Sequence, residues 1–115
     1  MESNDILKIA VKALDDKKAH DIKVIKVDDL TVLADYFVIA TGNSNTPVRA
    51  LADEVDYKLS ESGVQPHHIE GKSSGWILLD YSSVVVHVFY KDAREFYSLE
   101  RLWQDGTDVD VNELL

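Results

Sequence analysis

GWILLDYSSVVVHVFY, residues 75–90, is the stretch that decides the expected fold. Two β-rich runs flank a polar, turn-forming cluster at residues 80–83, and this order predicts a β-hairpin. An even-length turn over that cluster places Leu79 opposite Val84 on the partner strand. Because strand side chains alternate, this pairing also determines which residues share a face.

The two faces of the predicted hairpin differ in chemistry. One face is aliphatic throughout and suits a core covered by helices: Ile77, Leu79, Val84, Val86 and Val88. The other face mixes aromatic side chains with a histidine and a carboxylate: Trp76, Leu78, Asp80, Val85, His87 and Phe89. We expect the mixed face to remain uncovered, because three helices can cover only one side of a small sheet well.

The mixed face is therefore a candidate docking surface. Exposed Trp and Phe side chains are anchors that protein interfaces favour, since each buries a large area for few frozen torsions. Glu70 and Asp80 would supply a polar rim. The alternative is that Trp76 and Phe89 are core residues under a loop or the C-terminal helix.

The rest of the chain alternates between helical and strand patterns. Apolar spacing predicts helices over residues 4–19, 47–61 and 92–103. Ser3 or Asn4 is the expected cap of the first helix, and Thr46 that of the second, with Pro47 as its first helical residue. β-rich runs predict strands over residues 21–27, 36–41 and near 67–69.

These elements predict a single-domain α/β fold, a mixed β-sheet with helices mainly on one face. The strand at residues 36–41, the second helix and the strand near residues 67–69 form a predicted crossover between parallel strands. The domain is expected to span residues 1–104. Residues 105–115 form an acidic C-terminal tail that is expected to be disordered or to lie on a basic surface.

Composition limits the class of protein. The chain has 115 residues, 45% of them hydrophobic and 29% charged, which is typical of one globular domain. It contains no cysteine, and its sequence shows neither a membrane-spanning apolar run nor the pattern of a signal peptide. We therefore expect a cytoplasmic protein that is not bound to a membrane.

The formal net charge is −9, from 21 acidic and 12 basic side chains. Such a chain is repelled by a phosphate backbone, which disfavours direct DNA binding. A basic protein is the natural electrostatic partner. The alternative is that the charge only keeps the protein soluble.

No specific catalytic or metal-binding motif is present in the sequence. Gly42, Asn43 and Ser44 follow a predicted strand, but the Gly-Lys-Ser/Thr of a phosphate-binding loop is missing, which favours a simple turn before a helix. Asp108 and Asp110 form a close acidic pair, but they lie in the predicted tail. The histidines are too scattered to share an ion. We therefore predict no catalytic residue, no metal and no cofactor.

Three ordered motifs are shared with a known family: DYFVIATGNS from Asp35, RALADEV from Arg49, and the stretch over residues 75–105. In this order they closely resemble the ribosomal silencing factor family, also called the Iojap-like family. The similarity covers about residues 10–105. One departure is the turn around Ser82, where relatives often have a glycine and an aspartate.

The resemblance implies a fold similar to nucleotidyltransferases but without known catalysis. It implies binding to the large ribosomal subunit at its fourteenth protein, which blocks joining of the small subunit and represses translation when nutrients are limiting. It also implies a homodimer in the free state and, from organelle relatives, a role in large-subunit assembly. The alternative function is a nucleotide-binding or nucleotidyl-transferring enzyme acting near residues 42–46.

Combined with the hairpin faces, the resemblance assigns contact with the ribosomal protein to one patch. The patch consists of Glu70, Trp76, Leu78, Asp80, His87, Phe89 and Tyr90.

Overall fold

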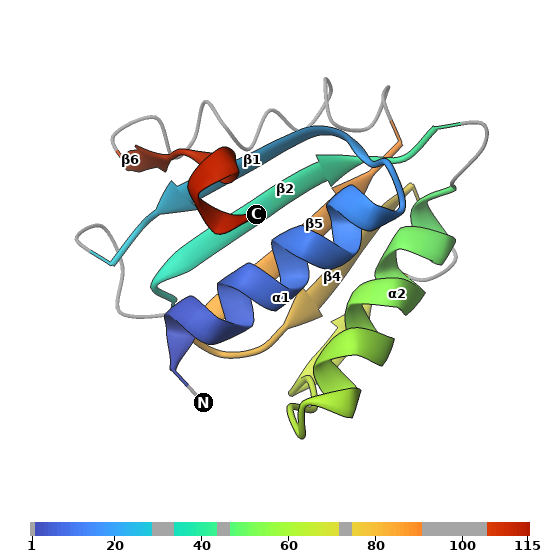
Figure 1. The fold of residues 1–115 in the computed structure, drawn as a ribbon. Helices are drawn as coiled ribbons and strands as arrows, with labels where there is room; N and C mark the ends of the chain where they lie inside the picture. The colour runs from blue at the N-terminus through green and yellow to red at the C-terminus, as the bar shows by residue number, and fades with distance from the viewer. Residues whose placement is uncertain (1, 29–33, 44–46, 72–74, 91–105) are drawn as a thin grey trace.

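A mixed six-stranded sheet forms the centre of the protein, and the helices of the described residues lie on one of its faces (Figure 1). The computed structural model describes residues 2–28, 34–43, 47–71, 75–90 and 106–115. The elements are α1 (Ser3–Asp16), β1 (His20–Lys26), β2 (Tyr36–Thr41), α2 (Val48–Glu61), β3 (His68–Glu70), β4 (Trp76–Asp80), β5 (Val84–Phe89), β6 (Thr107–Val109) and the 3-10 helix η1 (Val111–Leu114). The predicted α/β class is confirmed. The third predicted helix, over residues 92–103, lies outside the described residues.

The strand order is β3-β4-β5-β2-β1-β6, and β2 pairs with β5 in parallel while the other neighbouring strands are antiparallel. The chain passes from β2 through α2 to β3, which runs in the same direction as β2, as predicted. These two strands are not neighbours, because the β4–β5 hairpin lies between them.

The β4–β5 hairpin forms as predicted, but its register differs by two residues. Leu79 pairs with Val86 rather than Val84. The turn is tighter than expected, because the Tyr81 N–H donates to the Val84 carbonyl at 2.9 Å and leaves only two residues in the loop. One of them, Ser82, has a φ of 67°, a left-handed conformation that glycine adopts more readily than an L residue. Since the shift is even, every side chain keeps its predicted face.

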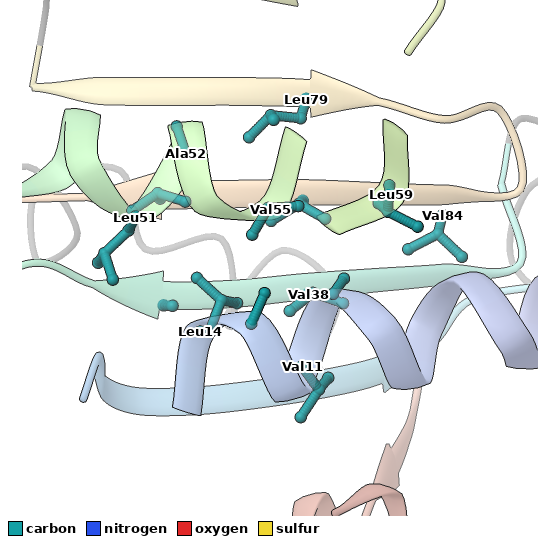
Figure 2. Close-up of a cluster of buried hydrophobic side chains, with 14 of the residues drawn as sticks. Val11, Leu14, Val38, Leu51, Ala52, Val55, Leu59, Leu79 and Val84 are labelled. Atoms are coloured by element: carbon teal, nitrogen blue, oxygen red, sulfur yellow. The ribbon is translucent and has the colours of Figure 1, made fainter. Parts of the chain in front are cut away.

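The aliphatic face of the hairpin packs under both helices, as Figure 2 shows. The apolar stripe predicted for α2 is buried in full: Val48, Leu51, Ala52, Val55 and Leu59. For α1 the apolar spacing predicts a buried stripe of Ile6, Ile9, Ala10, Ala13 and Leu14. The observed stripe also includes Leu7 and Val11, whereas Ile9 is only partly buried. The hairpin face and the helix stripes therefore form one core.

The start of α1 corrects the predicted cap. Glu2 occupies the N-cap position, and its backbone N–H donates to Asp5 Oδ2 at 3.2 Å. Ser3 does not cap the helix, because its hydroxyl donates to Asp35 Oδ2 at 2.7 Å and ties the helix to the start of β2. In α2, Pro47 stands at the N-cap position instead of inside the helix, and the predicted cap, Thr46, lies outside the described residues.

Both helices end in the same motif with different residues. After α2, Gly63 has a φ of 84°, and the Val64 N–H donates to the Leu59 carbonyl at 2.9 Å. After α1, Lys18 takes the equivalent place with a φ of 59°, and the Ala19 N–H donates to the Leu14 carbonyl at 3.0 Å. This Schellman arrangement favours glycine at the left-handed position.

The two helix ends give a matched prediction. We expect Lys18→Gly to raise the free energy of unfolding by about 0.5 kcal/mol, because it removes the left-handed strain of an L residue. We expect Gly63→Ala to lower the free energy of unfolding by about 1 kcal/mol, because it places an L residue in the same left-handed conformation. Urea unfolding of the two variants measures both changes. Equal effects of the same sign would contradict this account.

The C-terminal residues do not form a free tail over residues 106–115. Strand β6 pairs with β1, with Val109 opposite Val24. Val111 and Leu114 of η1 pack against the helix-covered core. The expectation of a disordered tail is therefore wrong, because Val109, Val111 and Leu114 are partly buried against the helix-covered core.

Candidate docking surface

The mixed face of the hairpin is covered near its centre, contrary to expectation. Phe89 is 0% exposed and His87 is 4% exposed. Phe89 belongs to a second apolar cluster on the far side of the sheet, where it is buried with Ile25, Val27, Ala34 and Ile39. The His87 ring packs beside this cluster, against the rings of Phe37, Trp76 and Phe89. The prediction that Phe89 and His87 are accessible for docking is wrong, because both side chains are buried among these neighbours.

Trp76 lies at the margin of this second cluster and is held in a defined orientation. Its ring stacks on Phe89 with centroids 5.0 Å apart. Its indole N–H donates to Nδ1 of His87 at 3.2 Å. Phe37 meets the other side of the His87 ring edge-on, with centroids 5.1 Å apart. Trp76 is half-buried and preorganised, so it offers contact area without loss of side-chain freedom on binding.

The protonation state of His87 follows from this contact. Because Nδ1 accepts the indole N–H, the neutral ring carries its proton on Nε2. Nε2 is buried and makes no hydrogen bond within the described structure. Burial lowers the pKa of His87 from its ordinary 6.5 to about 4, so the ring is neutral near pH 7.

The accessible part of the predicted patch lies along β3 and β4. In this antiparallel pair Glu70 is opposite Leu78, and His68 is opposite Asp80, so all four side chains share the face of Trp76. A hollow of about 230 Å³ lies between Glu70, Gly71, Trp76 and Leu78. We call the side chains of Glu70, Trp76, Leu78 and Asp80 the edge surface.

Two carboxylates form the rim of the edge surface. The side chain of Glu70 is 68% exposed, whereas that of Asp80 is 27% exposed. Asp80 Oδ1 accepts the Ser82 N–H at 2.8 Å, so this residue also fixes the hairpin turn. An apolar floor with acidic groups beside it suits a partner that presents apolar and basic side chains together.

Tyr90 lies just beyond β5 and is 49% exposed. Its backbone N–H donates to the Gly75 carbonyl at 2.9 Å, which places it beside the start of β4. The structure therefore brings five of the predicted docking residues to the surface near the hairpin and places His87 and Phe89 beneath them.

The glycine of the predicted turn has a packing role. A Cβ at Gly42 would lie 2.8 Å from the Val48 backbone N, so only glycine lets β2 approach the start of α2 this closely. Asn43 Nδ2 donates to the Lys18 carbonyl at 3.1 Å and ties this loop to the end of α1. Both contacts support the interpretation of this segment as a structural turn.

The described part of the chain contains no group of three His, Asp or Glu side chains arranged to hold a metal ion. A hollow of about 290 Å³ lies between α1 and α2, and its charged lining residues are Lys12, Asp16, Lys58 and Glu61. No helix among the described residues is long and apolar enough to cross a bilayer.

Comparison with known proteins identifies the family of this chain. Residues 1–115 match the family described as "Ribosomal silencing factor during starvation". The chain belongs to the ribosomal silencing factor family. The resemblance inferred from the sequence motifs is thereby confirmed.

The relatives of this silencing factor include bacterial and organellar proteins. It is 43% identical over 113 residues to a ribosomal silencing factor of Bacillus subtilis (strain 168), covering 97% of this chain and 96% of the relative. It is 36% identical over 97 residues to the Mus musculus protein named "Mitochondrial assembly of ribosomal large subunit protein 1", covering 81% of this chain and 42% of the relative. A crystal structure of a Chromobacterium violaceum protein has a TM-score of 0.86 at 43% identity and covers 90% of this chain and 88% of that chain.

One residue of the silencing factor's edge was missed from the sequence. His68 lies between Glu70 and Asp80, but its partner Asp80 is twelve residues away along the chain. The alternation of strand side chains could have paired His68 with Glu70. The contact with Asp80 depends on the register between β3 and β4, which the sequence pattern did not define.

Proposed function

We propose that this silencing factor binds the large ribosomal subunit through the edge surface and thereby blocks association with the small subunit. Its contact on the subunit is the fourteenth ribosomal protein, and the result is lower translation when nutrients are scarce. The mechanism is steric occlusion, so no covalent bond is made or broken. A contribution to large-subunit assembly is consistent with the name of the mouse relative.

The observation that carries this proposal is the chemistry of the edge surface. Trp76 and Leu78 provide partly exposed apolar area beside a hollow, and Glu70 and Asp80 place negative charge on its rim. The formal net charge of −9 favours a basic protein surface over ribosomal RNA, whose phosphates repel it.

We also propose that the free protein is a cytoplasmic homodimer whose interface overlaps the edge surface. Both interactions would bury the same apolar side chains, so dimerisation and ribosome binding compete. Analytical ultracentrifugation over a concentration series, with and without the ribosomal protein, measures this competition. A dimer that persists inside the complex would contradict the overlap.

Substitutions on the edge surface test the docking. We expect Leu78→Ser and Glu70→Lys each to weaken binding to purified large subunits about tenfold, because one removes apolar contact and the other reverses a rim charge. Co-sedimentation with large subunits, over a range of subunit concentrations, measures the affinity. These variants are more informative than Trp76→Ala, because Trp76 also supports the second core.

The matched control is Tyr57→Ser. Tyr57 is 58% exposed and belongs to α2, on the other face of the sheet. We expect Tyr57→Ser to bind large subunits with the affinity of the wild type. Circular dichroism checks the fold of each variant. If both edge variants sediment like the wild type, the edge surface does not dock the ribosome.

The enzymatic alternative has its own test. Isothermal titration with nucleoside triphosphates and magnesium is expected to show no binding heat, because the Gly-Lys-Ser/Thr of a phosphate-binding loop is missing after Gly42. Saturable heat would support nucleotide binding instead.

A further inference from the structure

His68 is the one imidazole that faces both carboxylates of the edge surface. Its Nε2 lies 3.8 Å from Glu70 Oε1, and its Nδ1 lies 3.7 Å from Asp80 Oδ2. The ring is half-exposed, so it exchanges protons with solvent. Both distances are within the range of an ion pair and longer than a hydrogen bond.

The placement of the two carboxylates suits the protonated ring better than the neutral ring. A neutral imidazole has one N–H, so it can donate to one carboxylate and turns a lone pair toward the other. A protonated imidazole has two N–H groups and can donate to both. Protonation therefore changes how the ring can pair with the two carboxylates.

Among the described residues, no lysine or arginine lies within 4.0 Å of Glu70 or Asp80. Asp80 Oδ1 is occupied by the Ser82 N–H, which leaves Oδ2 toward His68. Strand β3 is at the edge of the sheet and pairs with β4, so Glu70 and Asp80 are the charged groups of the described strands that face the ring.

We propose that His68 controls the charge of the edge surface, which accepts a cationic side chain of the partner when the imidazole is neutral and rejects it when the imidazole is protonated. The neutral form leaves two carboxylates for a lysine or arginine. The protonated form pairs with both carboxylates and repels the incoming cation. This inference rests on the proposed function, because it concerns the same docking surface.

The test compares the affinity of the full-length protein for purified large subunits at about pH 8 and about pH 6, the range over which histidine changes charge. We expect the wild type to bind about fivefold more weakly at the lower pH, whereas His68→Gln binds equally at both. His67→Gln, a change at the neighbouring exposed histidine, should keep the wild-type pH dependence. Burial keeps the pKa of His87 at about 4, so the second core does not titrate in this window.

A variant that removes the charge of Glu70 provides a second test of the proposal. Glu70→Gln should bind more weakly than the wild type at the higher pH, because one of the two carboxylates that attract the partner's cation is gone. Its affinity should also fall less between the higher and the lower pH, because the protonated imidazole then has only one carboxylate to pair with. A pH dependence that survives in His68→Gln, or that is absent from the wild type, would overturn the inference while leaving the proposed docking intact. If the wild type fails to bind large subunits at either pH, the proposed function and this inference both fall.

Discussion

Phe89→Ala is expected to lower the free energy of unfolding by about 4 kcal/mol, as is usual when a fully buried aromatic side chain is truncated. Phe89 is 0% exposed and stacks on Trp76, so the substitution leaves a cavity in the second core and releases the indole ring. Urea unfolding followed by circular dichroism measures the loss. The sequence pattern alone had suggested a docking anchor, for which the same substitution would leave the fold unchanged.

Two further substitutions separate stability from docking. Val85→Ala changes a half-buried residue of the same cluster and strand, and it should cost about 1 kcal/mol because less apolar area is lost. Phe89→Leu keeps most of the buried volume, so it should remain folded and bind large subunits like the wild type. A stable Phe89→Ala protein that no longer binds subunits would instead make Phe89 a contact residue.

Acid is expected to destabilise the protein through His87. The pKa of this group is about 4 in the folded protein, lowered by burial, and its ordinary value of 6.5 applies to the unfolded chain. The unfolded state therefore binds a proton first as the pH falls. The stabilisation is complete above pH 6.5, decreases as the pH falls toward 4 and is lost below it, with a total of roughly 3 kcal/mol.

The Trp76 contact makes this dependence measurable. Protonated His87 can no longer accept the indole N–H, so tryptophan fluorescence should change together with the unfolding midpoint. His87→Phe should reduce the change in the free energy of unfolding between pH 6.5 and 4, although it also loses the hydrogen bond from Trp76. His20→Gln alters an exposed histidine and should keep the wild-type slope. An unchanged slope in His87→Phe would contradict the assignment to this residue.

Local patterns were sufficient for much of the fold. The apolar stripe of α2 and the two faces of the hairpin were predicted correctly, because helical and strand periodicities depend on residues close together in the chain. Pairings between distant residues were less well predicted. Leu79 meets Val86 instead of Val84 because the tight turn at Ser82 decides the register, and the turn length is not encoded in strand alternation.

Local sequence patterns also predicted only part of the candidate site. Side-chain alternation correctly placed Trp76, Leu78 and Asp80 on one face, but it could not show whether that face was covered. Phe89 packs with Ile25 of β1 and Ile39 of β2 in a second core, and this contact depends on the order of strands in the sheet.

By itself, the sequence determined the α/β class, the amphipathic faces and the family, because these depend on residue types in a given order. Tertiary structure alone decided which aromatic residues are core, which remain accessible and which charges meet. His68, Glu70 and Asp80 come together only when β3 pairs with β4. Burial and electrostatics are properties of atoms near one another in space, so they follow from the folded arrangement of strands.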